Sequence, residues 1–133
     1  MVDAIGIAVS GLAAAGEKAR TAASNIANMG TVGALDPADG PAPYAPQDIV
    51  QKTDAGGGVL TSQVARDPAF SPAYDPNSPF ANEQGIVGAP NVDLATEAMT
   101  LKQAELAYKA SAAVIRTAEK MQDELLKSVD KKI

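Results

Sequence analysis

The sequence has no Cys, no His and no Trp, and its only aromatic residues are three Tyr and two Phe. These absences remove thiol nucleophiles, disulfides, imidazole bases and the usual ligands of zinc and copper. Chemistry by Asp, Glu or Lys stays open on composition alone, but none of these residues recurs in a catalytic or metal-binding pattern. The sequence therefore predicts no enzyme, no catalytic residue, no cofactor, no metal site and no small-molecule substrate.

Basic residues are scarce in the middle of the chain. The net charge is -5, and acids and bases cancel in residues 1–33 and again in residues 91–133. Residues 34–90 hold seven acids but only Lys52 and Arg66 as bases. Without a basic face, we expect no nucleic-acid partner.

Long apolar runs are also missing. Residues 4–16 are uncharged, but this run is well short of the ~20 apolar residues that a spanning helix needs. A secretory signal needs a basic segment before its apolar run, and only Met1, Val2 and Asp3 precede this one. We therefore expect neither membrane insertion nor a cleaved signal peptide.

Proline is absent from both ends of the chain. All nine Pro residues lie between Pro37 and Pro90, which indicates a helix, an irregular middle and a second helix. The predicted fold class is mainly α, with long terminal helices forming a helical hairpin or coiled-coil layer and a Pro/Gly-rich middle containing one small β-hairpin. Residues 1–33 and 91–133 would form a discontinuous helical core domain, and residues 34–90 a small outer region.

The N-terminal helix carries one apolar seam with a 3-4 spacing, which favours packing against a partner helix. The seam consists of Ile5, Ala8, Leu12, Ala15, Ala19, Ala22 and Ile26. Most of these residues are Ala, and Gly6, Gly11 and Gly16 each cost about 1 kcal/mol relative to Ala in a helix. Alone in water this helix would be marginal, so we expect neighbouring helices to surround it.

The C-terminal helix is predicted from Asp93, as its N-cap, to about Lys127, a length of roughly 50 Å. Such a helix is too long for a small globule to cover. It carries two apolar stripes. One consists of Leu94, Ala98, Leu101, Ala104, Tyr108, Ile115, Ala118 and Leu125, and the other of Met99, Leu106, Ala110, Val114 and Met121. One stripe can take the N-terminal helix, the other needs a further partner, and Met99 and Met121 are expected as core filler.

The middle segment contains two short strand candidates, residues 48–52 and 59–64, joined by a glycine-rich tip. They predict a hairpin. Residues 67–80, DPAFSPAYDPNSPF, carry Pro at intervals of three or four residues. That spacing excludes a helix or a central strand and favours extended or polyproline II backbone.

The segment SGLAAAGEKARTAASNIANMGT, residues 10–31, resembles the N-terminal motif of the bacterial flagellar axial proteins, the rod and hook family. In that family Ser-Gly-Leu opens the helix and an Ala-Ser-Asn-Ile-Ala-Asn run closes it. Residues 74–93, YDPNSPFANEQGIVGAPNVD, followed directly by a long helix, are similar to the short proximal-rod members of the family.

The resemblance implies a structural subunit of the flagellar basal-body rod. Such subunits leave the cell through the flagellar type III export apparatus without a cleaved signal. They polymerise through their terminal helices into a tube that crosses the periplasm, transmits torque and encloses the export channel. The implied partners are copies of the chain itself, other rod proteins and the export apparatus.

Together with the resemblance, the sequences of the two predicted helices indicate which residues would form the polymer interface. On the residues alone, Asn25 and Asn28 are better explained as a solvated polar face of the helix. With the resemblance, we expect them to satisfy backbone groups where the helix ends or to bond to a neighbouring subunit. The full predicted set is Ile5, Leu12, Ala19, Asn25, Ile26, Asn28, Leu94, Leu101, Leu106, Tyr108, Val114, Ile115, Met121 and Leu125.

A different class of function also fits the pattern of two helices and a Pro-rich middle. A soluble helical-hairpin adaptor or export chaperone would bind a single partner and would be folded and discrete by itself. A polymer subunit would instead gain most of its order from its neighbours.

Overall fold

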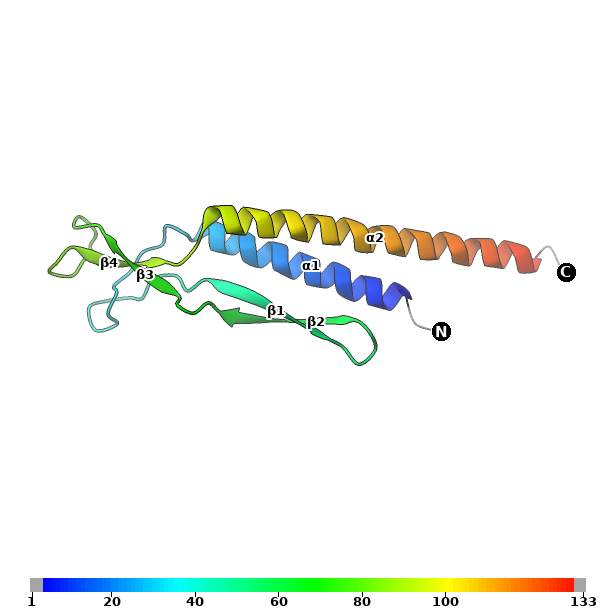
Figure 1. Ribbon diagram of the computed structural model, residues 1–133, viewed down its shortest axis with the longest axis horizontal. Helices are drawn as coiled ribbons and strands as arrows, with labels where there is room; N and C mark the ends of the chain where they lie inside the picture. Colours follow the sequence, from blue (N-terminus) through cyan, green and yellow to red (C-terminus); the bar gives the residue numbers. More distant parts are fainter. Residues whose placement is uncertain (1–3, 131–133) are drawn as a thin grey trace.

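A computed structural model describes residues 4–130 of the chain as an elongated molecule (Figure 1). Helix α1 spans Ala4–Ala27 and helix α2 spans Leu94–Asp130. The two helices run antiparallel beside each other, with four strands between them in the sequence. The predicted order of helix, middle and helix is confirmed, and α2 extends three residues beyond the expected end at Lys127.

The start of α2 follows from its capping residue. The Asp93 Oδ2 accepts a hydrogen bond from the backbone N–H of Thr96 at 3.0 Å, and the Thr96 hydroxyl donates to the same oxygen. These hydrogen bonds hold the pKa of Asp93 below its ordinary value. Asp93 is therefore the N-cap that the sequence predicts.

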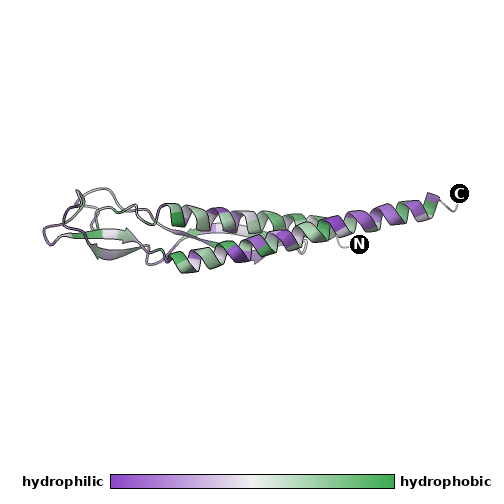
Figure 2. Cartoon of the chain, turned by 90° about the horizontal axis from the view of Figure 1, so that it is seen from above, coloured by the Kyte–Doolittle hydropathy of each residue, from purple (hydrophilic) through white to green (hydrophobic). Residues whose placement is uncertain are grey.

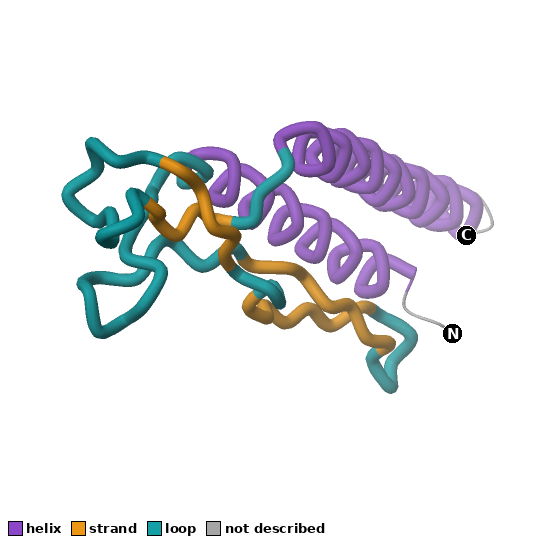
Figure 3. Tube along the Cα trace, turned by 60° about the vertical axis from the view of Figure 1, so that its left-hand side comes forward, coloured by secondary structure: helices purple, strands orange, loops and turns teal. Residues whose placement is uncertain are grey.

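Helix α1 lies between α2 and the strand pair β1 and β2 (Figure 3). All seven residues of the predicted seam are buried or half-buried. A second face of α1, not expected from the seam, contacts the strands: the Thr21 hydroxyl accepts a hydrogen bond from Gln63 at 3.3 Å, and the Ser10 hydroxyl accepts one from the Val59 N–H at 3.0 Å. Small residues thus let α1 be covered on two sides within one chain.

The predicted hairpin is present and slightly longer than expected. Strand β1 (Gln47–Thr53) pairs antiparallel with β2 (Val59–Ala65), from Gln47 opposite Ala65 to Thr53 opposite Val59. The connection holds the triple glycine, and Gly57 adopts φ of +88°. The glycines therefore form a turn, as the sequence indicates.

The remainder of the middle segment is more regular than predicted. Strand β3 (Phe70–Tyr74) pairs antiparallel with β4 (Ile86–Pro90) in a second two-stranded sheet beyond the end of the helices (Figure 1). The expectation of one hairpin in an otherwise irregular middle was therefore incomplete. Both strands of a two-stranded sheet are edge strands, so Pro72 and Pro90 are tolerated although they donate no hydrogen bond.

The loop after α1 is fastened to β4 through two glycines. The Gly33 N–H donates to the Gly88 carbonyl at 3.1 Å, and the Gly88 N–H donates to the Gly33 carbonyl at 2.9 Å. A Cβ at Gly33 would lie 2.5 Å from the Pro41 carbonyl oxygen, so only glycine fits. This contact anchors the second sheet near the junction of the two helices.

Helix α2 is the least covered part of the molecule. Only Glu97 and Ala104 are buried along its length, because α1 is the only helix or strand that packs extensively against it. Apolar residues alternate with hydrophilic ones toward its far end (Figure 2). Neither α1 nor α2 is apolar over a stretch long enough to cross a membrane, within the described residues 4–130.

Candidate assembly surfaces and the polar junction

The predicted interface residues divide into two groups in the structure. One group lies in the contact between α1 and α2 and is half-buried within the single chain. Its members are Ile5, Leu12, Ala19, Ile26, Leu101 and Ile115. Leu101 and Tyr108 of the first apolar stripe line a groove together with Ala19 of α1. The first stripe therefore takes the N-terminal helix, a choice that the sequence left open.

The ends of that first stripe remain exposed. Leu94 is the first residue of α2 and is half exposed, and the Leu125 side chain is 65% exposed. The first described residue of α1, Ala4, lies beside Ala118 and Met121. Leu125 therefore lies beyond the described part of α1.

The second stripe of α2 forms a continuous exposed surface, which we call the outer ridge: Met99, Leu106, Val114 and Met121. Leu106 is 66% exposed and Met121 is 69% exposed. The expectation that Met99 and Met121 fill a core within the chain is wrong, because both side chains are more than 60% exposed. Exposed large apolar side chains in a row indicate an interaction surface.

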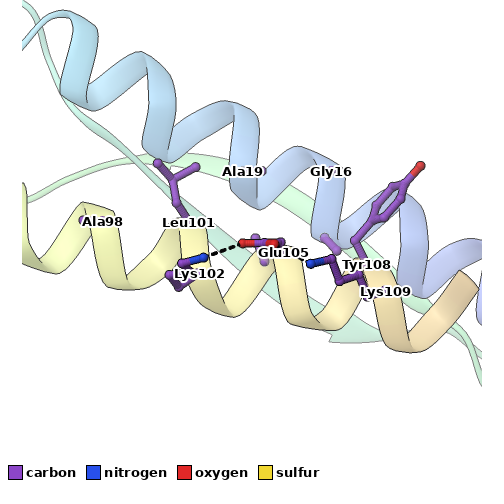
Figure 4. Close-up of a pocket in the computed structure, with 10 residues that line it drawn as sticks. Gly16, Ala19, Ala98, Leu101, Lys102, Glu105, Tyr108 and Lys109 are labelled. Atoms are coloured by element: carbon purple, nitrogen blue, oxygen red, sulfur yellow. Dashed lines mark hydrogen bonds and ion pairs between the residues drawn. The ribbon is translucent and has the colours of Figure 1, made fainter. Parts of the chain in front are cut away.

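A groove of about 570 Å³ runs between α1 and α2 on another side (Figure 4). Small residues line it, so the backbones are accessible to a neighbour. The groove is formed by Ala15, Gly16 and Ala19 of α1 and by Ala98, Leu101, Ala104 and Tyr108 of α2, with Lys102, Glu105 and Lys109 at its edge. The predicted residue Tyr108 is 46% exposed here.

The charged edge of the groove is internally paired. The Lys102 Nζ lies 2.9 Å from a Glu105 carboxylate oxygen, and Lys109 pairs with the other oxygen (Figure 4). The hydrogen bonds from Lys109 and Lys102 lower the pKa of Glu105 to about 2. Two lysines and one carboxylate leave this edge with a net positive charge.

At the other end of the helices, Asn25 belongs to a partly buried cluster that we call the polar junction: Asn25, Asp48, Arg66 and Glu97. Asn25 is 1% exposed. Its Nδ2 donates to the Gln47 carbonyl at 2.8 Å and to the Glu97 Oε1 at 3.2 Å. Its Oδ1 accepts from the Gln47 N–H at 3.0 Å and from the Tyr44 hydroxyl at 3.1 Å.

Arg66 holds the junction together by electrostatics. Its Nη2 lies 2.6 Å from Asp48 Oδ1 and 2.7 Å from Glu97 Oε1, and its Nη1 donates to the Asn91 carbonyl at 2.8 Å. The hydrogen bond to Asp48, partly opposed by burial, raises the pKa of Arg66. The Glu97 side chain is only 3% exposed, so Arg66 and Asn25 supply the hydrogen bonds that a buried carboxylate requires.

The two asparagines of the motif have different surroundings. Asn25 binds the backbone of Gln47, where β1 begins, while the Asn28 Nδ2 donates to the Ser24 carbonyl at 2.9 Å on the exposed end of α1. Asn25 thus bonds to its own chain, and Asn28 satisfies a helix-end carbonyl. The contact of either with a neighbouring subunit stays a prediction.

Sequence reasoning missed Arg66 and Glu97 as members of this cluster. Glu97 looked like a favourable acid in the first turn of a helix, which it also is. Arg66 is one of only two bases in the acidic middle segment and directly follows β2. The scarcity of bases in this segment was the only sequence signal for Arg66, since its partners Asp48 and Glu97 lie 18 and 31 residues away in the chain.

None of these sites resembles a metal centre. Among residues 4–130, no three carboxylates lie together as ligands for an ion. Every buried side-chain nitrogen and oxygen in this part of the chain has a hydrogen-bond partner.

Comparison with known proteins gives a match to a flagellar rod family at each end of the chain. Residues 5–34 match the family described as flagella basal body rod protein, and residues 83–128 match flagellar basal body rod FlgEFG protein C-terminal. The two matches contain nearly all of α1 and of α2.

Three full-length relatives are each 32% identical over 127 residues, with 91% of this chain and 92% of the relative covered. They are the flagellar basal-body rod proteins FlgC of Salmonella typhimurium, of Buchnera aphidicola subsp. Acyrthosiphon pisum and of Escherichia coli O157:H7. With the two terminal helices matched and the middle segment included in the aligned length, this chain belongs to the FlgC family of flagellar basal-body rod proteins.

Proposed function

We propose that the chain acts as a structural subunit, without enzymatic activity, that polymerises through α1 and α2 into the tubular part of the flagellar rod. Residues 1–33 and 91–133 would build the wall of the tube, and residues 34–90 would form its outer region. The observation that carries the proposal is the outer ridge of α2, a row of large apolar side chains that the described residues 4–130 leave 48–69% exposed.

The exposure of α2 is too extensive for a protein that works alone. Apolar side chains more than half exposed recur from Met99 to Val129, which is most of the helix length. Monomeric soluble proteins rarely expose such continuous apolar surface. Neighbouring subunits that bind the folded helices would cover it and stabilise the folded state by mass action.

The family supplies the cellular setting of the proposal. The partners would be copies of this chain and other rod proteins, delivered by the flagellar type III export apparatus. The assembled tube would cross the periplasm, transmit torque and enclose the export channel. A charged side of α2 that includes Lys102, Glu105 and Arg116 is the candidate lining of that channel.

A charge placed on the outer ridge tests the proposal. In Leu106→Asp or Met121→Asp the folded chain should melt as the wild type does, because both side chains already face solvent. The variant should nevertheless be absent from isolated basal bodies. Gln122→Asp is the matched control, since it adds the same charge one residue from Met121 at a polar position.

Normal incorporation of both ridge variants would overturn the polymerisation surface. Loss of the Gln122→Asp control as well would show that any added charge blocks export or assembly, and the ridge would then have no special role.

The polar junction favours a second candidate, the self-contained adaptor, because every buried polar group there is satisfied within the chain. Amide hydrogen exchange separates the two. A rod subunit should show fast exchange in the part of α2 beyond Ala118 as a monomer and strong protection there in basal bodies. An adaptor should be protected in that part already as a monomer.

A further inference from the structure

Helix α1 carries a second row of buried and half-buried side chains besides its apolar seam. At ~100° per residue, these side chains lie within about 60° of one another around the helix, and the row is centred roughly 130° from the seam. Hydroxyl and amide groups recur in this row, whereas the seam has none. We call the row the hairpin dock: Ile7, Ser10, Ala14, Thr21 and Asn25.

The polar groups at the two ends of the hairpin dock bond to the backbone of the β1–β2 hairpin. Asn25 bonds to both the N–H and the carbonyl of Gln47, the first residue of β1. The Ser10 hydroxyl accepts from the N–H of Val59, the first residue of β2, at 3.0 Å. In an antiparallel pair the two first residues lie at diagonally opposite corners, and alternate N–H and C=O groups point outward from the pair. Helix α1 therefore satisfies one edge of the hairpin at its base and the other edge at its tip.

The lengths of the helix and the hairpin match between these two anchors. Ser10 and Asn25 are 15 residues apart, which is roughly 22 Å along a helix. A strand of seven residues, the length of both β1 and β2, spans roughly 20 Å. The bond from Gln63 to the Thr21 hydroxyl lies between the anchors. The hairpin thus lies along α1 with both of its ends fixed.

Two of the three glycines at the hairpin tip touch the hairpin dock. A Cβ on Gly58 would lie 2.7 Å from the Ser10 hydroxyl oxygen, and one on Gly57 would lie 3.3 Å from Ile7 Cδ1. A Cβ on Gly56 would instead meet only a side chain of the same turn, at 3.4 Å. The glycines therefore have a role beyond turning the chain, because they let the tip approach α1 closely.

Neither partner of this contact is strong by itself. Gly6, Gly11 and Gly16 lower the helix propensity of α1, and a short helix without tertiary packing is marginal in water. A single two-stranded hairpin is also marginal in water. Order in each element therefore depends on contact with the other.

We propose that the β1–β2 hairpin is a strap that closes over the hairpin dock and orders α1 within the single chain, before any neighbouring copy binds. Ser10 and Asn25 anchor the strap, and Gly58 is the point at which its tip closes. The Ser and the first Asn of the segment 10–31 thereby gain an intramolecular role. The proposal goes beyond the rod function and does not depend on it, because every contact that it uses lies within one chain.

A methyl group at the closure point tests the strap in the purified chain. In Gly58→Ala the new Cβ should displace the Ser10 hydroxyl from the Val59 N–H. Amide hydrogen exchange should then become about fivefold faster, the effect of one lost hydrogen bond. The decisive amides are residues 18–25 of α1, because they lie far from the tip and a local distortion of the turn would not reach them.

The matched control is Gly56→Ala, two residues away in the same turn. Neither Gly56 nor Gly58 has a positive φ, so the backbone admits Ala at both positions. The control should leave exchange at residues 18–25 unchanged. Equal exchange rates there in the two variants would overturn the strap.

Removal of the anchor gives a second test with a distinctive sign. Ser10→Ala raises the intrinsic helix propensity of α1, so a helix that did not need the strap would exchange more slowly. The strap predicts exchange about fivefold faster in both α1 and the hairpin. Ser24→Ala is the control, since its exposed hydroxyl lies 3.2 Å from the Tyr44 hydroxyl and not beside the hairpin. Slower exchange in Ser10→Ala than in the wild type would overturn the proposal.

The double variant Ser10→Ala with Gly58→Ala tests whether both changes act on one contact. Without the Ser10 hydroxyl the new methyl group loses the atom nearest to it, so the combined effect on exchange should be smaller than the product of the two single effects. Effects that multiply would show two independent sites and would overturn the closure point. These measurements use the purified chain, so their failure would leave the rod function standing, whereas absence of the wild-type chain from basal bodies would remove the rod function and leave the strap.

Discussion

The two ends of α2 differ in where their partners come from. At its first turn Glu97 is buried and bonded to α1 and to the residue that follows β2, all within one chain. At its last turns Leu125 and Val129 face solvent. Intramolecular contacts satisfy the first end, whereas the second end is exposed. Under the proposed rod function, stability and assembly would therefore depend on different parts of one helix.

The largest expected loss of stability comes from removing the ion pair at the first turn of α2. Arg66→Met leaves the buried Glu97 carboxylate without its ion pair, which should destabilise the fold by about 3 kcal/mol. Urea unfolding of the purified chain measures this loss. Arg20→Met, which removes the exposed pair with Glu17, is the control and should leave the unfolding midpoint unchanged; equal midpoints for both variants would contradict the role of the junction.

The next effect distinguishes the two motif asparagines. Asn25→Ala removes hydrogen bonds to Gln47, Glu97 and Tyr44 and should cost about 2 kcal/mol, because buried groups lose their partners. Asn28→Ala removes two exposed hydrogen bonds, to the Ser24 carbonyl and from the Thr31 hydroxyl, and should cost only a few tenths of a kcal/mol because water replaces them. Thermal melting of both variants tests the difference, and an equal loss would show that Asn25 is not the structural residue.

The next expected effect is smaller and is a gain in the stability of the folded chain. Gly16→Ala should stabilise the purified chain by up to about 1 kcal/mol, because the helix gains propensity and the new Cβ meets open space. Gly11→Ala should gain less, since Ser111 must move to admit the new methyl group. A Gly16→Ala variant less stable than the wild type would show that this wall is already filled in the monomer.

The smallest effect concerns the ions at the groove edge. Glu105 has a pKa of about 2, below its ordinary 4.5. Its pairs with Lys102 and Lys109 therefore stabilise the folded chain above pH 4.5, and this contribution is lost as the pH falls toward 2. NMR titration of the Glu105 carboxyl should show a higher pKa in Lys109→Ala and no change in Lys127→Ala.

Much of the architecture follows from local sequence signals. The 3-4 spacing of Leu12, Ala15 and Ala19 predicts the seam, and Asp93 caps α2 where the sequence indicates. The glycines after Thr53 turn the first hairpin. Each of these features depends on residues close to one another in the chain, so the pattern itself contains the information.

The features that were missed depend on distant partners. Pro72 argued against regular pairing, yet β3 pairs with β4 because an edge strand tolerates proline. Arg66 and Glu97 meet across 31 residues, and no periodic pattern marks that contact. The outer ridge was predicted as a stripe, but the sequence did not show that α1 would leave Met99 and Met121 uncovered.

The position of Arg66 has a mechanical consequence. Its guanidinium contacts Asp48 on β1, Glu97 on α2 and the carbonyl of Asn91 in the segment entering α2, so three separate parts of the chain meet at one rigid planar group. Three contacts fix the orientation of the hairpin relative to α2, whereas two contacts would still allow it to rotate about the line that joins them. Twisting the β1–β2 hairpin relative to α2 therefore stretches at least one of these contacts.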